Sequence, residues 1–333
     1  SRLSPQLGLS HHSVETAVVA QLQEAYQKAA NKLLGWVTSQ LERTNADKYG
    51  GLQVREIVFR NFCRLYHYGK VTGSKEILEW VARNKDLQRN RVALSTHLEK
   101  PANRWELRTL LLLLADSLRT LVDTGSCNDL RDELAWALSH MGLNQFHLGL
   151  SGEARENVIE AVELFTTLVD KEKQHEFRPA LATTLYRASK IADAMGLGQE
   201  AREQAERAVS DLVELVEDRG RSDLQSRLGI SMALRGSLKN DAGDVAGAMK
   251  DLQRASSLLA SSSEDKQREN KSSQVEVQLE LASIFLKARD IDNAIKESGK
   301  AVQLATQAAE ELQMEELQPL LASCHTSRAR CFL

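Results

Sequence analysis

Three pairs of histidine and cysteine residues have spacings that could place two metal ligands on one face of a helix. The pairs are Cys63 with His67, His140 with His147, and Cys324 with Cys331. Structural zinc sites use four nitrogen or thiolate ligands held in a tetrahedron. No third or fourth ligand lies near Cys63 and His67 in the sequence, so side-chain packing is the simpler interpretation of all three pairs.

Other patterns that carry chemistry are absent or weak. The chain has no phosphate-binding loop and no GxSxG, HExxH or CxxC motif. The stretch "GLGQEA" at 196–201 follows a helical pattern rather than a strand, which favours a turn between helices over a nucleotide-binding loop. The basic stretch "RNKDLQRNR", 83–91, could contact phosphates, but it lacks the interleaved aromatic residues that stack on bases. We expect no catalytic residue, no metal and no cofactor, and therefore no enzyme activity in this chain.

Composition indicates a helical protein that can fold. Of 333 residues, 42% are hydrophobic and 27% charged, and four are proline, which favours helix throughout. Residues 55–108 hold 12 basic and 6 acidic side chains, whereas residues 109–333 hold 26 and 36. A basic segment joined to an acidic one could steer partners of opposite charge toward each segment. The net charge of −3 for the whole chain makes nucleic acid an unlikely partner. Four cysteines and no run of 18 apolar residues predict an intracellular chain, cytoplasmic or nuclear, that does not insert into a membrane.

The C-terminal two thirds of the chain repeat a sequence pattern. "GLSGEARENVIEAVELF" at 149–165 and "GLGQEAREQAERAVSDL" at 196–212 are identical at 8 of 17 positions. The same pattern returns in "GAMKDLQRA" and "NAIKESGKA", with spacings of 47, 47 and 46 residues between the first alanines. A fixed period of this length is typical of stacked helical hairpins, each of which buries its apolar face against its neighbours.

Small residues recur at fixed places within each copy and are expected at close helix contacts. Two alanines seven residues apart share a helix face, and a small residue twelve positions earlier is predicted to face them from the preceding helix. The predicted packing residues are Gly142, Ala154 and Ala161; Ser189, Ala201 and Ala208; Gly236, Ala248 and Ala255; and Ala282, Ala294 and Ala301.

This arrangement of a small residue, a loop, "EA" and a second alanine resembles the tetratricopeptide repeat family over residues about 125–333. The period of 46–47 residues departs from the family's 34 and resembles its long-helix variants. The resemblance implies an all-α fold, a right-handed α-solenoid of about four to five antiparallel hairpins. We expect residues 1–124 to form a divergent helical subdomain, and the polar stretch 261–274 to form an exposed loop. The chain begins without an initiator Met and ends inside a helical pattern, so we expect it to be a fragment of a longer protein.

The resemblance also implies which positions line the inner groove of the solenoid. Counted from the small residues, these are Trp136, Ser139, Leu143, Phe146 and His147; Thr183, Tyr186, Lys190, Asp193 and Ala194; Ile230, Ala233, Ser237, Asn240 and Asp241; and Glu276, Leu279, Ser283, Leu286 and Lys287. Ten are the candidate partner-binding residues: Trp136, Phe146, His147, Tyr186, Lys190, Asp193, Ser237, Asn240, Asp241 and Lys287. The family's carboxylate clamp needs Lys and Asn where this chain has Ser139 and Leu143, which argues against recognition of chaperone C-termini. Core packing is the alternative interpretation for Trp136 and Phe146.

Three functions are compatible with this pattern. The first is a protein-interaction scaffold that binds a peptide or helix of a partner protein in its groove. The second is the sensor or regulatory arm of a multidomain ATPase, protease or transcription regulator, in which the groove binds another domain of the same longer chain. The third, nucleic-acid binding through residues 55–108, is the least favoured because the basic stretch 83–91 lacks interleaved aromatic residues.

Overall fold

A computed structural model describes residues 104–123, 128–261, 264–312 and 318–331, together with Lys28 and Lys32. The expectations for Cys63, His67, the basic stretch 83–91, Cys127 and the helices before residue 104 lie outside these residues. The chain divides into two compact units, Ser1–Leu164 and Phe165–Leu333. The boundary that the repeats suggest, between residues 124 and 125, also lies outside the described residues.

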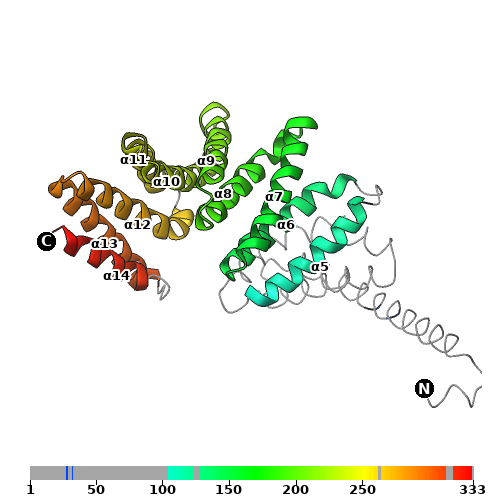
Figure 1. The fold of residues 1–333 in the computed structure, drawn as a ribbon, viewed down its shortest axis with the longest axis horizontal. Helices are drawn as coiled ribbons and strands as arrows, with labels where there is room; N and C mark the ends of the chain where they lie inside the picture. The colour runs from blue at the N-terminus through cyan, green and yellow to red at the C-terminus, as the bar shows by residue number, and fades with distance from the viewer. Residues whose placement is uncertain are drawn as a thin grey trace, which may run out of the picture. The chain divides into compact units, whose positions relative to one another are not determined.

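All regular structure in the described residues is helical, which confirms the predicted all-α fold of helical hairpins (Figure 1). The α-helices are α5 (Arg104–Asp123), α6 (Arg131–His147), α7 (Ser151–Thr166), α8 (Arg178–Ala194), α9 (Gly198–Val213), α10 (Gln225–Asp241), α11 (Val245–Ala260), α12 (Glu264–Lys287), α13 (Ile291–Leu312) and α14 (Gln318–Arg330). We call α6, α8, α10, α12 and α14 the first helices, and α7, α9, α11 and α13 the second helices.

The 47-residue period of the sequence is also the period of the structure. The first helices α6, α8 and α10 have 17 residues each, and the second helices α7, α9 and α11 have 16. The π-helical turns Thr167–Lys171 and Glu214–Asp218 extend α7 and α9. Short 3-10 turns, His175–Phe177 and Ser222–Leu224, then lead into α8 and α10. These extensions, together with helices of four to five turns, account for a repeat longer than 34 residues.

The turn inside each hairpin is built in the same way four times. Gly149, Gly196, Gly243 and Arg289 have positive φ angles of 79°, 74°, 86° and 61°. In each turn the next amide donates to the carbonyl five residues earlier, for example Leu150 N to Gln145 O at 2.9 Å and Asp290 N to Phe285 O at 2.9 Å. This is the Schellman arrangement, in which glycine ends a helix without steric cost. Arg289 adopts the same conformation with a side chain.

The small residues lie where the two helices of a hairpin touch. A Cβ atom added to Gly142 would lie 2.9 Å from the Ala154 carbonyl oxygen, and one added to Gly236 would lie 3.3 Å from that of Ala248. The hydroxyl of Ser189 donates to the Ala201 carbonyl at 2.8 Å in the same place. The eight alanines and Ala282 of the predicted packing set are at most 1% exposed: Ala154, Ala161, Ala201, Ala208, Ala248, Ala255, Ala294 and Ala301 with Ala282.

Successive hairpins of the second unit share one continuous core. Leu212 of α9, Leu228 of α10, Leu252 of α11 and Leu281 of α12 belong to a single buried cluster. The first helices α8, α10 and α12 contact one another in sequence, and each second helix packs against the first helix that follows it (Figure 1). The unit therefore has a layer of first helices that meet directly and a layer of second helices that fill the spaces behind them.

The expected loop at 261–274 is wrong: α12 already begins at Glu264. The Asn270 carboxamide is buried and accepts a hydrogen bond from the Ser226 hydroxyl of α10, and the Gln274 side chain donates to the Leu259 carbonyl at 2.8 Å. The polar composition was a poor guide because Glu, Lys, Gln and Arg are good helix formers. The amide side chains then find partners on the preceding hairpin.

In the first unit, α5 packs against α6 through a row of leucines. Leu107, Leu111, Leu114 and Leu118 are at most 1% exposed. These residues recur at steps of three and four, which puts them on one helix face. Leu107 and Leu114 occupy the places where the other second helices carry alanines. The Asn144 side chain adds a 2.9 Å hydrogen bond to the Arg104 carbonyl.

Candidate partner-binding cavity

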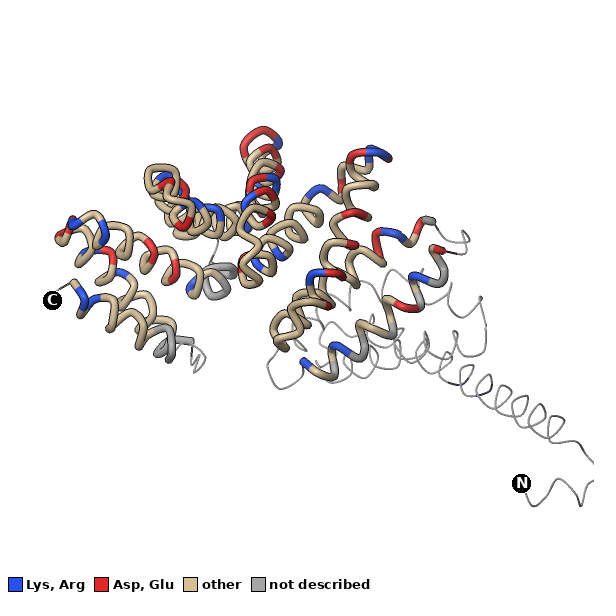
Figure 2. Tube along the Cα trace, in the orientation of Figure 1, with Lys and Arg blue, Asp and Glu red and all other residues tan. Residues whose placement is uncertain are grey.

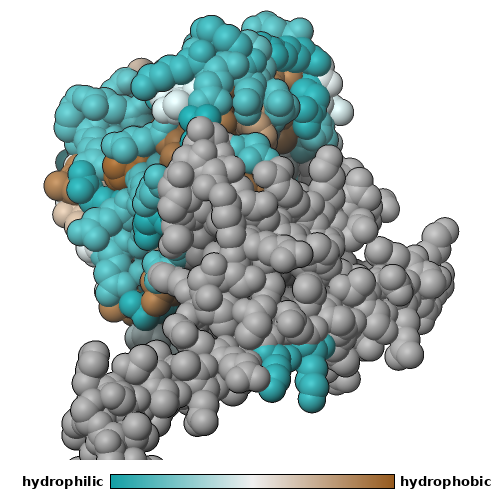
Figure 3. All heavy atoms as spheres, turned by 90° about the vertical axis from the view of Figure 1, so that its right-hand side faces the viewer, coloured by the Kyte–Doolittle hydropathy of each residue, from teal (hydrophilic) through white to brown (hydrophobic). Residues whose placement is uncertain are grey.

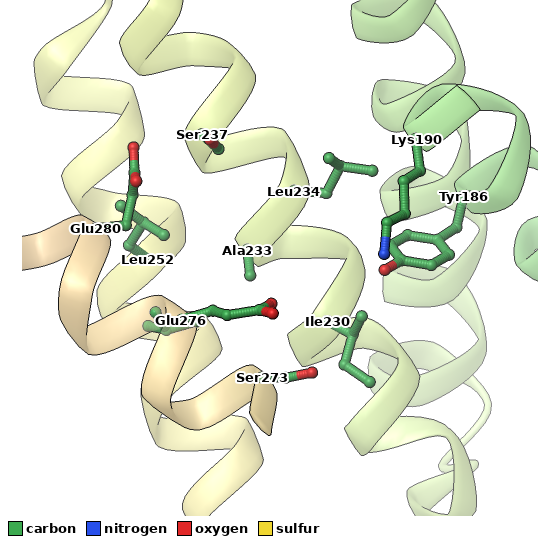
Figure 4. Close-up of a pocket in the computed structure, with 11 residues that line it drawn as sticks. Tyr186, Lys190, Ile230, Ala233, Leu234, Ser237, Leu252, Ser273, Glu276 and Glu280 are labelled. Carbon is green, nitrogen blue, oxygen red and sulfur yellow. The ribbon is translucent and has the colours of Figure 1, made fainter. Parts of the chain in front are cut away.

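A cavity of about 180 Å³ opens on the layer of first helices in the second unit. Tyr186 and Lys190 approach it from α8, and Glu276 approaches it from α12 across Ala233 of α10 (Figure 4). We call it the first-helix cavity; its lining residues are Tyr186, Lys190, Ile230, Ala233, Leu234, Ser237, Leu252, Ser273, Glu276, Val277 and Glu280. Three consecutive hairpins thus contribute to one hollow.

Side-chain direction explains this convergence. Tyr186 and Lys190 are four residues apart on α8, as are Ala233 and Ser237 on α10 and Glu276 and Glu280 on α12. Residues at this spacing share a helix face. Because α8, α10 and α12 are adjacent, their three faces meet along one surface.

The cavity combines an aromatic ring with charged groups of both signs. Desolvation, with a smaller contribution from the Glu276 charge, raises the pKa of Tyr186 to about 12, so its hydroxyl is neutral at physiological pH. Desolvation also raises the pKa of Glu276, and the positive charge of Lys190 partly opposes that rise. The Lys190 ammonium group of α8 therefore interacts electrostatically with the Glu276 carboxylate of α12. No ion pair between Lys190 and Asp193 occurs among the described residues, although the two share a face of α8.

Further acidic groups lie beside the cavity, toward the C-terminal ends of α8 and α10. The Asn240 side chain donates to Glu280 at 3.1 Å and so links α10 to α12. Desolvation raises the pKa of Asp193, and the negative charge of Asp241 on α10 raises it further. The carboxylates of Asp193 and Asp241 are thus close enough to repel each other, and both residues are exposed.

A second hollow of about 500 Å³ adjoins the first at Ile230, toward the N-terminal end of α10. Its lining residues are Pro179, Arg221, Asp223, Leu224, Ser226, Arg227, Ile230 and Asn270. The Arg221 guanidinium pairs with Asp223 at 2.8 Å. The surface of the first helices is therefore hollowed over most of the length of α10.

The ten candidate partner-binding residues are distributed unevenly. Tyr186, Lys190 and Ser237 line the first-helix cavity. Asn240 is bonded to the lining residue Glu280, whereas Asp193 and Asp241 are not part of the lining. Lys287 is exposed in the last turn of α12 and is not part of the lining. Trp136, Phe146 and His147 belong to α6 in the other compact unit. In that unit the rings of Trp136 and His140 lie 4.3 Å apart between centroids.

Several lining residues were not among the ten candidates. Ile230, Ala233 and Glu276 hold groove positions that the family resemblance implies, but they were not chosen as partner-binding residues. Glu280 and Ser273 were missed altogether. Glu280 follows Glu276 by one helical turn, so the spacing within α12 is a signal that could have identified it. Ser273 precedes the expected start of the helix and could not be assigned to any face.

Several acidic side chains elsewhere in this unit are paired with basic ones. The Asp251 carboxylate, 6% exposed, accepts two 2.7 Å hydrogen bonds from Arg235 and one of 2.9 Å from Lys239. Burial disfavours the charged form of Asp251, but the hydrogen bonds from Arg235 and Lys239 outweigh it and lower the pKa. Charges of both signs also alternate along α9 (Figure 2). The ion pairs of this part of the unit are Arg178–Glu214, Arg219–Glu214, Arg254–Glu217, Arg235–Glu206 and Arg207–Asp170.

The paired cysteines and histidines of the sequence form no site in the described residues. Cys324 and Cys331 are both buried, and burial raises the pKa of the Cys324 thiol, which makes it a poor nucleophile. No group of three or more potential ligands is arranged to hold a metal ion in the part of the chain that the structure describes.

The described surface visible in Figure 3 is predominantly hydrophilic, with separate apolar areas. Among the helices that the structure describes, none has the combination of length and apolar character needed to cross a bilayer.

Comparison with known proteins gives structural neighbours only. No protein-family model matches the chain, and no curated protein matches it in sequence. Similar solved structures include BtubC from P. vanneervenii, at 14% identity over 70% of this chain and 91% of that chain, with a TM-score of 0.42. The nearly identical TPR-like repeats of a Podosopora anserina kinesin light chain match at 17% identity over 73% and 95%, with a TM-score of 0.41.

A third similar structure is the signal transduction ATPase with numerous domains and a tetratricopeptide repeat sensor from Pyrococcus horikoshii. It matches at 14% identity over 93% of this chain and 49% of that chain, with a TM-score of 0.43. The structures to which the chain is similar thus include TPR-like repeat proteins. At these identities the likeness concerns the fold, and it transfers no ligand or partner to this chain.

Proposed function

We propose that the chain is a protein-interaction module that binds a segment of a partner in the first-helix cavity. The partner segment belongs to another protein or to another domain of a longer chain. The observation that carries this proposal is the convergence of Tyr186, Lys190 and Glu276 from α8 and α12 on one hollow. These three side chains make no hydrogen bond within the described residues, so their polar groups are available to a partner.

The chemistry of the lining suits a peptide better than a drug-sized ligand. Pockets for drug-sized ligands usually enclose about 300–1,000 Å³ and are mostly apolar, whereas this one has about 180 Å³ and several charged residues. A hollow of this size admits one or two side chains of a longer segment. Tyr186 offers a flat apolar ring and a hydroxyl that stays neutral, a combination frequent among residues that dominate binding energy.

Selection of binders from a random peptide library, with the chain as bait, tests this proposal. Selected peptides should lose affinity by about tenfold or more when Tyr186 is replaced by Ala, because anchoring aromatic residues contribute at this level. Met195→Ala is the matched control, since Met195 is exposed in the α8–α9 turn, away from the cavity lining. Equal affinity of the Tyr186→Ala variant for every selected peptide would refute the assignment of the cavity.

Stability must be measured on the same variant. Tyr186 is partly buried, so its truncation removes some apolar contact, but a core aromatic would cost about 3–5 kcal/mol of unfolding free energy. We expect a smaller loss. If Tyr186→Ala destabilises the chain by the full amount, the residue belongs to the core, and the affinity loss cannot be attributed to a missing contact with the peptide.

A further inference from the structure

We infer that the first-helix cavity receives a basic side chain, lysine or arginine, of the bound segment. This inference rests on the proposed function and specifies the chemistry of its partner. It starts from the distribution of charge between the two layers of the second unit.

Acidic residues in and beside the cavity form no ion pair in the described part of the chain, whereas several acidic residues elsewhere in the unit do. Asp251, Glu214 and Glu217 each pair with arginine. Among the described residues, by contrast, no ion pair within 4 Å involves Glu276, Glu280, Asp193 or Asp241. A cation arriving with a partner would give these carboxylates the kind of ion pair that Asp251, Glu214 and Glu217 already have.

The charges around the cavity do not balance. Glu276 and Glu280 carry two negative charges in the lining, and Lys190 supplies one positive charge. Asp193 and Asp241 follow Lys190 and Ser237 by three and four residues and add two negative charges, whereas Arg187 adds one positive charge near Tyr186. The groups facing Glu276 are Lys190 and Tyr186 from α8, Glu280 from its own helix, and the uncharged Ile230, Ala233 and Ser237 from α10. The net negative field favours a positively charged segment over a neutral or acidic one.

The shape of the cavity fits the same ligand. The ring of Tyr186 forms one wall, and the Glu276 carboxylate reaches in from the opposite helix (Figure 4). An ammonium or guanidinium group placed between them is attracted by the ring face and by the carboxylate together. The apolar side chains of Ile230, Leu234 and Val277 can contact the methylene groups of a long basic side chain.

Lys190 has a specific role in this arrangement. Its ammonium group occupies the cavity beside Tyr186 and partly neutralises Glu276 in the absence of a partner (Figure 4). An incoming cation must therefore displace this group or share the carboxylates with it. Two substitutions in one cavity are then expected to act in opposite directions, which a purely structural role of these residues would not produce.

Paired peptides test the inference. Binders selected from a random library are synthesised in two forms, with the basic residue retained or replaced by glutamine, and their affinities for the unmodified chain are compared. We expect the basic form to bind at least about fivefold more tightly, and Glu276→Gln to weaken that form by a similar factor. Lys190→Ala should strengthen it by roughly two- to fivefold, the range of an exposed ion pair. Glu176→Gln, an exposed acidic residue outside the cavity lining, should change nothing.

The outcomes separate this inference from the proposed function. Selected peptides that depend on Tyr186 but bind equally well with glutamine in place of the basic residue would overturn the inference and leave the proposed function standing. A library that yields no peptide dependent on Tyr186 would overturn both.

A further measurement varies the pH, because protonation of Glu276 removes its negative charge and with it the attraction for the basic side chain. Affinity for the basic peptide should fall as the pH is lowered through the raised pKa of Glu276, and this fall should be smaller in Glu276→Gln.

Discussion

Gly236 of α10 provides a direct test of how closely the helices of a hairpin approach each other. We consider the substitution Gly236→Leu. The first carbon of any side chain at this position would lie 2.9 Å from Leu252 Cγ and 3.3 Å from the Ala248 carbonyl oxygen. Both distances are shorter than ordinary van der Waals contact. Leu252 is 1% exposed and Ala248 is 0% exposed, so neither has free space into which it can move.

Two opposing effects set the size of the change. Replacing a helical glycine by leucine gains somewhat less than about 1 kcal/mol of helix propensity. Overpacking a filled core costs about 1–3 kcal/mol, and the leucine adds three carbons beyond the Cβ that already collides. We therefore expect a net loss of about 0.5–2 kcal/mol, or roughly 1–8 °C in melting temperature for a unit of this size.

Gly299→Leu in α13 is the matched control. A Cβ atom at Gly299 would meet no atom within 4 Å, so only the propensity gain should remain and the melting temperature should stay unchanged or rise. Urea and thermal unfolding followed by far-UV circular dichroism measure both variants. If Gly236→Leu melts at the same temperature as the unmodified chain, the hairpin helices are not in the close contact described here and the repeat register is wrong.

Three further variants test the ion pairs, the turns and the cavity. Asp251→Ala leaves Arg235 half-buried without its bidentate partner and should cost about 3–5 kcal/mol in urea unfolding; a loss below about 1 kcal/mol would make the pair an ordinary surface contact. Arg289→Gly relieves a positive φ of 61° and should raise stability by up to about 1 kcal/mol, whereas Gly243→Ala should lower it by a similar amount. Difference absorbance titration of the chain against Tyr186→Phe should show the phenol ionising near pH 12, and a midpoint near pH 10 would contradict its desolvation. Because the folded state holds that proton more tightly, Tyr186 should contribute a loss of stability as the pH rises from 10 to 12.

The helical architecture could be predicted from the sequence because small residues recur where the two helices of a hairpin approach too closely for large side chains. Gly142, Ser189 and Gly236 recur at one period, and each faces the first turn of the following helix. The sequence did not indicate that Gly229 lies in an equally tight place, where a Cβ atom would come within 2.9 Å of Leu259 Cγ. The equivalent residues, Ala135 and Ala182, are alanines and do not stand out among the many alanines of the chain.

The elements that lengthen the repeat were harder to predict. The π-helical turns Thr167–Lys171 and Glu214–Asp218 are each followed two residues later by a residue with a positive φ angle, Lys173 and Gly220 respectively. Only Gly220 is a glycine, so the sequence indicates the positive φ angle at that position but not at Lys173. The polar stretch after α11 was misassigned as a loop for a related reason: its residues suit both an exposed connection and a helix, and contacts such as Ser226 with Asn270 decide between them.

The cavity shows a different limit of sequence analysis. The family resemblance implies a groove face, and three of the positions that it selects, Tyr186, Lys190 and Ser237, line one hollow. Spacing cannot show which neighbouring helix supplies the opposing charge, since that depends on how far each hairpin is rotated against the next. Asp193 lies three residues after Lys190 on the same helix. The carboxylate on which the Lys190 charge acts is nevertheless that of Glu276, where it opposes the rise in pKa caused by desolvation, and Glu276 belongs to a helix more than 70 residues further along the chain. The charge interaction in the cavity therefore arises between repeats rather than within one, and a change in the repeat length between α11 and α12 would alter it without changing any residue of the cavity.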